Sequence, residues 1–149
     1  MKPNHHVIIS GGVSAIFALW AQSWGAVVAC FLSGIFIDLD HHLDYFIFKK
    51  ELPLSYKKLV HFLRHEHRSK LFLFLHSYEV LVLIWIAIFL LGLDLVWIGI
   101  AIGFTTHILC DEAFNPISPR GYFLTYRAKN RFARKVFFKK GHHDETAED

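Results

Sequence analysis

The chain has 149 residues, enough for one domain, and hydrophobic residues make up 54% of it. An ordinary soluble domain is roughly 45–50% apolar, so the composition argues against a water-soluble fold. The formal net charge of +3 does not point to nucleic acid, because the Lys and Arg residues are segregated along the chain in the way that orients membrane proteins.

Two apolar stretches near the N-terminus predict the first membrane spans. The first covers about residues 6–21 and resembles a signal peptide. We expect it to be retained, because Trp20 and Gln22 stand where a cleavage site needs small residues. The second covers about residues 24–37, which is shorter than the ~20 residues that cross a hydrocarbon core. We therefore expect its helix to continue through residues 38–48.

The middle of the chain predicts a basic loop and two further spans. In the loop, residues 49–70, Pro53 ends the preceding helix and residues 56–65 predict a short helix. The third span covers residues 71–93 and the fourth about residues 95–110. The sequence thus predicts an all-α integral membrane bundle of about four transmembrane helices, in a domain of residues 1–116.

Residues 122–138 predict an amphipathic helix after a turn that contains Pro and Gly. Apolar side chains keep helical spacing on one side, at Phe123, Tyr126, Ala133 and Phe137. Cations keep it on another side, at Arg127, Arg131, Arg134 and Lys135. We assign residues 117–140 to a basic interfacial helix that faces anionic lipid headgroups, and residues 141–149 to a disordered polar tail. A solvated helix packed on the domain is the alternative.

The distribution of charge predicts the topology. All 16 Lys and Arg residues lie in the N-terminal start, the middle loop and the tail, and the links at about residues 22–25 and 92–94 contain none. Because Lys and Arg stay on the cytoplasmic side, we expect a multi-pass protein of the cell (inner) membrane with both termini in the cytoplasm. This topology also gathers most of the His and Asp residues at one membrane face.

The strongest local signal for chemistry is the run DLDHHLD at residues 38–44. On a helix, Asp38, His41 and Asp44 are spaced three apart, so one face offers a carboxylate, an imidazole and a second carboxylate. Divalent metal ions accept such nitrogen and oxygen donors, and a bound cation would relieve the repulsion between the carboxylates. The alternative is a solvated acidic helix end.

The fourth span offers a second donor pair. Gly99, Gly103, His107 and Asp111 are spaced four apart and share one helix face. Small residues on that face let a neighbouring helix approach closely, which would bring the imidazole and carboxylate near other ligands. Asp111 could bind a metal directly or orient the imidazole of His107.

Other donors stand near the same predicted membrane face. His76 and Glu79 lie one turn apart near the loop end of the third span, and they could instead bond each other. At the N-terminus either His5 or His6 could point inward, and the sequence leaves both open. In the loop, Arg68 suits phosphate because its guanidinium is planar. The histidines at 61 and 65 could form a second metal site, although such a run is usually a solvated basic face.

These donors define the predicted site. The expected metal ligands are His6, Asp38, Asp40, His41, His76, His107 and Asp111. Zinc is the favoured metal, with manganese or magnesium as alternatives because of the carboxylates. Asp44 or Glu79 would act as general base and Arg68 would bind phosphate.

The order of these motifs resembles the YdjM-like family of small membrane proteins, classed as predicted metal-dependent hydrolases. It is carried by an N-terminal His that opens an apolar helix, the run GIFIDLDH from Gly34, His67-Arg68 followed by His76-Ser77, and the pair His107 and Asp111. This chain has Ile37 where the family pattern has Pro. The family is distantly similar to zinc-dependent phospholipases C, which implies hydrolysis of a phosphodiester or lipid headgroup.

Two functional hypotheses follow. The first is a membrane-bound hydrolase of a lipid or phosphoester substrate, in which a metal ion polarises the ester oxygen and supplies hydroxide from bound water. The second is a non-catalytic membrane protein, metal-binding or purely structural, whose His and Asp residues tie the helices together. An ion or proton pathway is disfavoured, because the outer halves of the spans have little polar character.

Overall fold

The computed structural model describes residues 3–52, 55–65 and 70–138 of the chain. These residues form helices and no strand, apart from two isolated bridges, so the all-α prediction is confirmed. The chain forms two compact units. The bundle unit consists of Met1–Ile37 and Ser77–Asn115, and the basic unit consists of Asp38–His76 and Pro116–Asp149.

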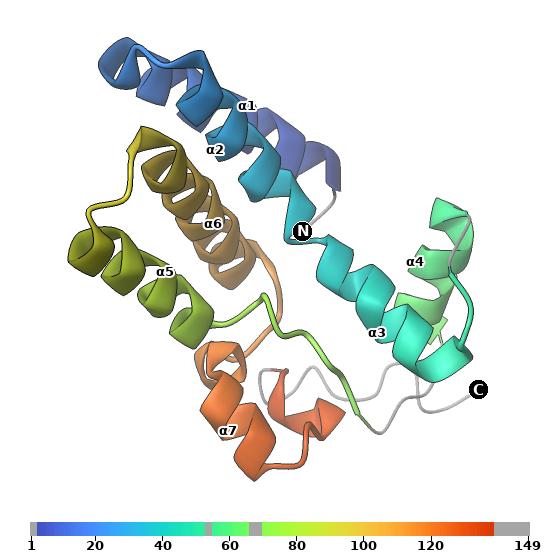
Figure 1. The fold of residues 1–149 in the computed structure, drawn as a ribbon. Helices are drawn as coiled ribbons and strands as arrows, with labels where there is room; N and C mark the ends of the chain where they lie inside the picture. The colour runs from blue at the N-terminus through green and yellow to red at the C-terminus, as the bar shows by residue number, and fades with distance from the viewer. Residues whose placement is uncertain (1–2, 53–54, 66–69, 139–149) are drawn as a thin grey trace. The chain divides into compact units, whose positions relative to one another are not determined.

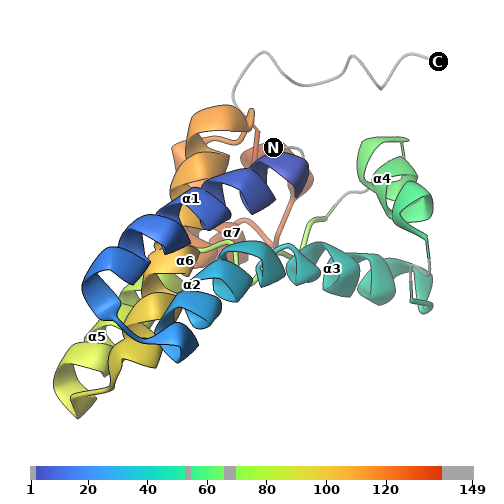
Figure 2. The same cartoon turned by 90° about the horizontal axis from the view of Figure 1, so that it is seen from above.

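In the bundle unit, α6 is the central helix. The unit contains α1 (Pro3–Ala21), α2 (Trp24–Phe36), α5 (Tyr78–Leu91) and α6 (Leu95–Phe114). Figures 1 and 2 show α6 lying between α2 and α5, and it also contacts α1. Polar residues cap three of these helices, since side-chain oxygens of Ser23, Ser77 and Asp94 accept backbone N–H groups of the first turns.

Small residues allow α2 and α6 to pack closely, as the sequence predicts. A Cβ atom at Gly99 would meet the carbonyl oxygen of Ala26, and one at Gly103 would meet the carbonyl oxygen of Cys30. The hydroxyl of Ser33 on α2 donates to the carbonyl oxygen of Ile100 on α6 at 3.0 Å. This contact face ends in His107 and Asp111, both of which are buried.

The bundle unit exposes many large apolar side chains and buries several polar ones in addition to its apolar core. His6, Ser10 and Ser14 follow one another along the buried face of α1. Large apolar side chains of α1 and α5 are 71–86% exposed, namely Ile8, Ile16, Leu19, Phe89, Leu90 and Leu91. Exposed apolar surface of this extent marks an interaction or membrane surface.

Two of the predicted spans meet the length and composition of a membrane-crossing helix within the described residues. They are Trp24–Lys49 and Leu95–Phe114. Only 28% and 39% of the most apolar 18-residue stretch of each helix is buried. A core helix of a soluble protein would be mostly buried. α5 is also apolar but has 14 residues, fewer than a full crossing needs.

The predicted continuation of the second span is confirmed. Ile37 and Asp38 keep right-handed helical backbone angles between α2 and α3 (Leu39–Lys49), and Lys50 ends α3 with a left-handed φ of 59°. The predicted loop helix is also confirmed as α4 (Tyr56–His65). In the basic unit, Phe62 of α4 packs edge-on against Tyr45 of α3, with ring centroids 4.7 Å apart.

The third predicted span begins later than expected. We predicted a helix from residue 71, but α5 begins at Tyr78. In the preceding segment the backbone N–H of Phe72 is donated to Asp44, and those of Leu75 and His76 are donated to Asp40. Because these side chains take the N–H groups, the segment has an alternative to helical hydrogen bonds.

The predicted tail helix over residues 122–138 is broken. The chain forms 3-10 turns at Pro119–Tyr122 and Arg134–Val136, and α7 covers Leu124–Lys129. Arg131 and Phe132 have left-handed φ angles of 55° and 57°, which end the helix. The carbonyl oxygen of Phe132 then accepts the N–H of Leu71 at 3.0 Å, so pairing with a distant segment replaces helical periodicity.

Candidate metal centre

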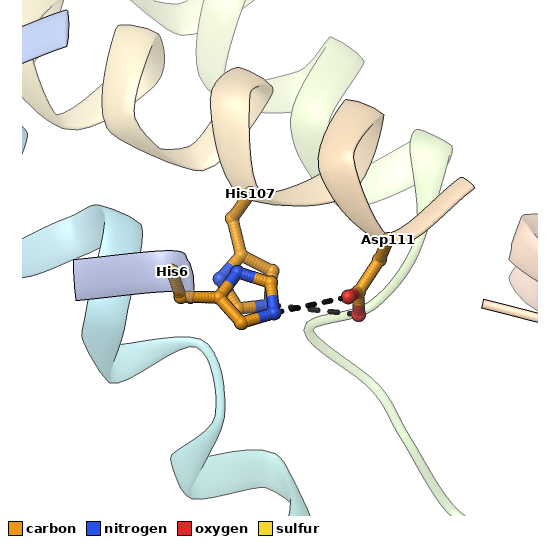
Figure 3. Close-up of side chains that lie close together, drawn as sticks. All are labelled: His6, His107 and Asp111. Atoms are coloured by element: carbon orange, nitrogen blue, oxygen red, sulfur yellow. Dashed lines mark ion pairs between the residues drawn. The ribbon is translucent and has the colours of Figure 1, made fainter. Parts of the chain in front are cut away.

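Three of the predicted ligands lie together in the bundle unit. His6 lies near the start of α1, and His107 and Asp111 lie one turn apart near the end of α6. All three are buried, with exposed fractions of 3%, 1% and 2%. Figure 3 shows both imidazole rings turned toward the Asp111 carboxylate. We call these three residues the His–His–Asp trio.

The donor atoms of the trio converge. His6 Nε2 lies 3.1 Å from Asp111 Oδ1, and His107 Nε2 lies 3.7 Å from Asp111 Oδ2. The two imidazole rings are stacked, with centroids 4.1 Å apart and planes inclined by 15°. One donor atom from each residue lies within 4.8 Å of the other two.

A backbone carbonyl fixes the orientation of His107. Its Nδ1 lies 2.8 Å from the carbonyl oxygen of Gly34, and an oxygen that can only accept requires Nδ1 to carry the proton. In the neutral ring this places the lone pair on Nε2, which faces Asp111. Metal-binding histidines use this same arrangement, in which the second ring nitrogen donates to a carbonyl or carboxylate.

The donor atoms of the trio are placed so that they could hold a metal ion. The lone pair of His107 Nε2 and the Asp111 carboxylate are both acceptors, and 3.7 Å is too long for a hydrogen bond between them. A cation between them is favourable to both. Ligands about 2.0–2.2 Å from a tetrahedral zinc ion lie about 3.3 Å from each other, and the spacings of 3.1 and 3.7 Å lie on either side of this value.

The structure also decides between the two N-terminal histidines. His6 is buried within the trio, whereas the neighbouring His5 is exposed. Ser10 lies one turn after His6 on the same buried face of α1, and a Cβ atom at Gly34 would meet its hydroxyl. The absence of a side chain at Gly34 therefore lets α1 approach the segment that holds His107.

Four other predicted ligands lie together in the basic unit. His76 Nδ1 lies 3.3 Å from Asp40 Oδ2, and His76 Nε2 lies 3.8 Å from Asp38 Oδ1. His41 Nε2 lies 3.7 Å from the same Asp38 oxygen, and its ring centroid is 5.0 Å from that of His76. The predicted carboxylate and imidazole face of α3 therefore has His76 as an additional neighbour.

Asp40 and Asp44 hold the segment before α5 in the basic unit. One Asp40 oxygen accepts the N–H groups of Leu75 and His76, at 2.7 and 3.2 Å, and Asp44 accepts that of Phe72 at 2.9 Å. Both carboxylates are buried. Their observed contacts position the backbone around His76.

The predicted catalytic residues have different surroundings. Asp44, expected as a general base, is fully buried, and one of its oxygens accepts the Phe72 N–H. Glu79, the other expected base, is half-buried in the first turn of α5 in the bundle unit. Arg68, expected to bind phosphate, lies outside the described residues, as does the predicted tail at 141–149.

Arg127 does not lie where the sequence pattern predicts it. The pattern predicts this side chain on a lipid-facing cationic surface, whereas Arg127 is fully buried and donates to the carbonyl oxygens of Leu73 and His76. Its guanidinium also lies over the Phe137 ring, 5.2 Å from the centroid. The sequence pattern also does not predict the role of Gly34 in orienting His107, because a contact made by a backbone carbonyl leaves no side-chain signal.

No protein-family model matches the chain, and no curated protein or solved structure matches it either.

Proposed function

We propose that this protein is a membrane-bound, metal-dependent hydrolase whose metal ligands are His6, His107 and Asp111. The observation that supports this most is the orientation of His107, whose Nδ1 is bonded to the Gly34 carbonyl while Nε2 faces Asp111. Three protein ligands leave one position of a tetrahedral ion for water or substrate, which is typical of catalytic zinc sites. Zinc is the proposed ion, with manganese or magnesium as alternatives.

The proposed reaction is hydrolysis of a phosphoester or lipid headgroup. A bound divalent ion supplies Lewis acidity at the ester oxygen and activates water. Among the predicted bases, we favour Glu79, because it belongs to the bundle unit and lies at the end of α5 that is on the trio's side of the bundle. The resemblance to the YdjM-like family, which the order of the sequence motifs suggests, would imply the same reaction class.

We place the protein in the cell (inner) membrane, with several crossings and both termini in the cytoplasm. Residues 3–37 and 77–115 of the bundle unit contain no Lys or Arg. Trp20, Trp24 and Trp97 are exposed near the α1–α2 and α5–α6 links, at the opposite end of the bundle from the trio. Tryptophan at one end and cations in the segments that join the other end are typical of an oriented membrane protein.

Metal analysis of detergent-purified protein tests this proposal. We expect one divalent ion per chain, lost in the variants His107→Ala and Asp111→Asn together with hydrolysis of phosphoester lipids. His5→Ala is the matched control, because it removes an exposed imidazole next to His6 and should keep both metal and activity. Full hydrolytic activity in metal-free protein would exclude the mechanism.

A non-catalytic role is the second candidate, and the burial of the trio favours it. A His–Asp cluster that is at most 3% exposed can join α1 to α6 without any ion. In that case purified protein contains no metal, and His6→Ala lowers the thermal stability by removing the contact with Asp111. The metal measurement on the unmodified chain therefore separates the two functions.

A further inference from the structure

A cationic pocket lies between α3 and α4 in the basic unit. It has a volume of about 410 Å³, and its lining combines three lysines with one glutamate and two residues with polar tips, namely Tyr45, Lys49, Glu51, Lys57, Lys58 and His61. Small-molecule sites usually enclose about 300–1,000 Å³, so this hollow has the size of a ligand site. The lysines and His61 are exposed.

The charge of the lining selects an anion. Three ammonium groups stand against one carboxylate, and that carboxylate accepts a hydrogen bond from Tyr45 Oη at 2.8 Å. Lys57 and Lys58 also lie in the first turn of α4, which has no acidic residue. The positive end of the helix dipole disfavours cations at this position, and a bound anion would relieve the repulsion.

The surroundings of the pocket indicate where the anion comes from. Phe46 on α3 and Leu52 after it are exposed, with fractions of 43% and 66%, and they are close in sequence to the lining residues Tyr45 and Glu51. Apolar neighbours do not stabilise bound free phosphate, whereas a phospholipid carries acyl chains next to its phosphate that can contact them. We propose that this pocket binds the phosphate of an anionic phospholipid headgroup.

This inference depends on the membrane placement proposed above, and it requires neither bound metal nor hydrolysis. The test measures lipid binding to the detergent-purified full chain by native mass spectrometry, with phosphatidylglycerol, phosphatidylcholine and inorganic phosphate as probes. We expect the chain to prefer phosphatidylglycerol to phosphatidylcholine, and this preference to weaken with added salt.

The variants compare equal changes of charge. The pocket variant Lys49→Gln/Lys57→Gln/Lys58→Gln should lower the affinity for phosphatidylglycerol roughly tenfold, since each exposed pair contributes a few-fold at most. The control replaces three exposed lysines outside the pocket, Lys50→Gln/Lys70→Gln/Lys129→Gln, and should change the affinity less than about twofold. Glu51→Gln should raise the affinity, because it removes the opposing charge and keeps an acceptor for Tyr45.

Equal losses of affinity for phosphatidylglycerol in the two triple variants would show diffuse charge attraction and would refute the pocket as the binding site. Binding of inorganic phosphate as tight as that of phosphatidylglycerol would overturn the headgroup assignment. A chain that keeps its metal and hydrolytic activity but shows no lipid preference would refute this inference and leave the proposed function intact.

Discussion

Arg127 shows how a charged residue can serve the fold of the basic unit. Its guanidinium is fully buried and donates to two backbone carbonyls, those of Leu73 and His76. Asp40 and Asp44 accept backbone N–H groups from the same segment. Carboxylates thus accept three N–H groups of the segment before α5, and one guanidinium binds two of its carbonyls. These contacts hold His76 in place without regular secondary structure.

Replacing Arg127 should therefore destabilise the basic unit. In Arg127→Met the two carbonyls lose charged donors in a buried setting, at a cost of roughly 2–4 kcal/mol. Arg127→Lys should lower the free energy of unfolding by less, since it keeps the charge. Some loss should remain, because lysine has no planar fork that reaches both acceptors. Thermal unfolding in detergent measures the effect.

Lys129→Met provides the comparison on the same helix. Lys129 is exposed, so its replacement should change the unfolding free energy by less than about 0.5 kcal/mol. Equal stability of the Arg127 and Lys129 variants would show that the buried guanidinium contributes nothing beyond its charge.

At the scale of elements, the close contact of α2 with α6 positions His107 of the His–His–Asp trio. Gly103 faces the backbone of Cys30 and Gly34, and a Cβ atom there would lie 2.9 Å from the Gly34 nitrogen. His107 follows one turn later and uses the Gly34 carbonyl. The helix contact and the orientation of the imidazole therefore share one backbone segment.

Gly103→Ala should disturb both the contact of α2 with α6 and the orientation of the His107 imidazole. The added methyl group would meet backbone atoms, which can move only together with their helix. We therefore expect the free energy of unfolding to fall by roughly 1–3 kcal/mol. Metal content should fall with it, because a separation of the helices lengthens the bond from His107 to Gly34. Unfolding and metal analysis on one preparation measure the two effects.

Gly12→Ala is the control on α1. No atom lies within 4 Å of a Cβ built at Gly12, and the alanine should stabilise the helix by up to about 1 kcal/mol. If both variants bind metal equally, the close approach of α2 and α6 is not what places His107.

At the scale of the whole molecule, the distribution of side chains argues for a lipid environment. Polar residues such as Ser10 and Ser14 are inside the bundle unit, while Leu19 and Phe89 are more than 80% exposed. In water such a surface would cost about 25 cal/mol for each Å² of apolar area left exposed. A hydrocarbon solvent removes that cost.

Cysteine labelling tests the proposed topology. In a Cys30→Ala/Cys110→Ala background, Gln22→Cys and Leu93→Cys should react with a membrane-impermeant reagent from outside the cell, because both positions are in links without Lys or Arg. Lys50→Cys should react after the membrane is opened. Labelling of all three from the same side, or release of the protein by alkaline washing, would refute the multi-pass arrangement.

The sequence determined the features that depend on local periodicity and composition. Apolar runs and small residues spaced four apart predicted α1, α2 and α6, the continuation from α2 into α3, and the shared face of His107 and Asp111. These follow from 3.6 residues per turn, so neighbours along the chain are enough to specify them.

Only the tertiary structure decided which distant groups meet. It turned His6 inward instead of His5, buried Arg127, delayed the start of α5 to Tyr78 and ended α7 at Lys129. In each case the partner is remote in sequence, such as the Asp111 carboxylate for His6 or the Leu73 carbonyl for Arg127. Buried polar groups must find partners wherever the fold supplies them, and a pattern along the chain does not encode where that will be.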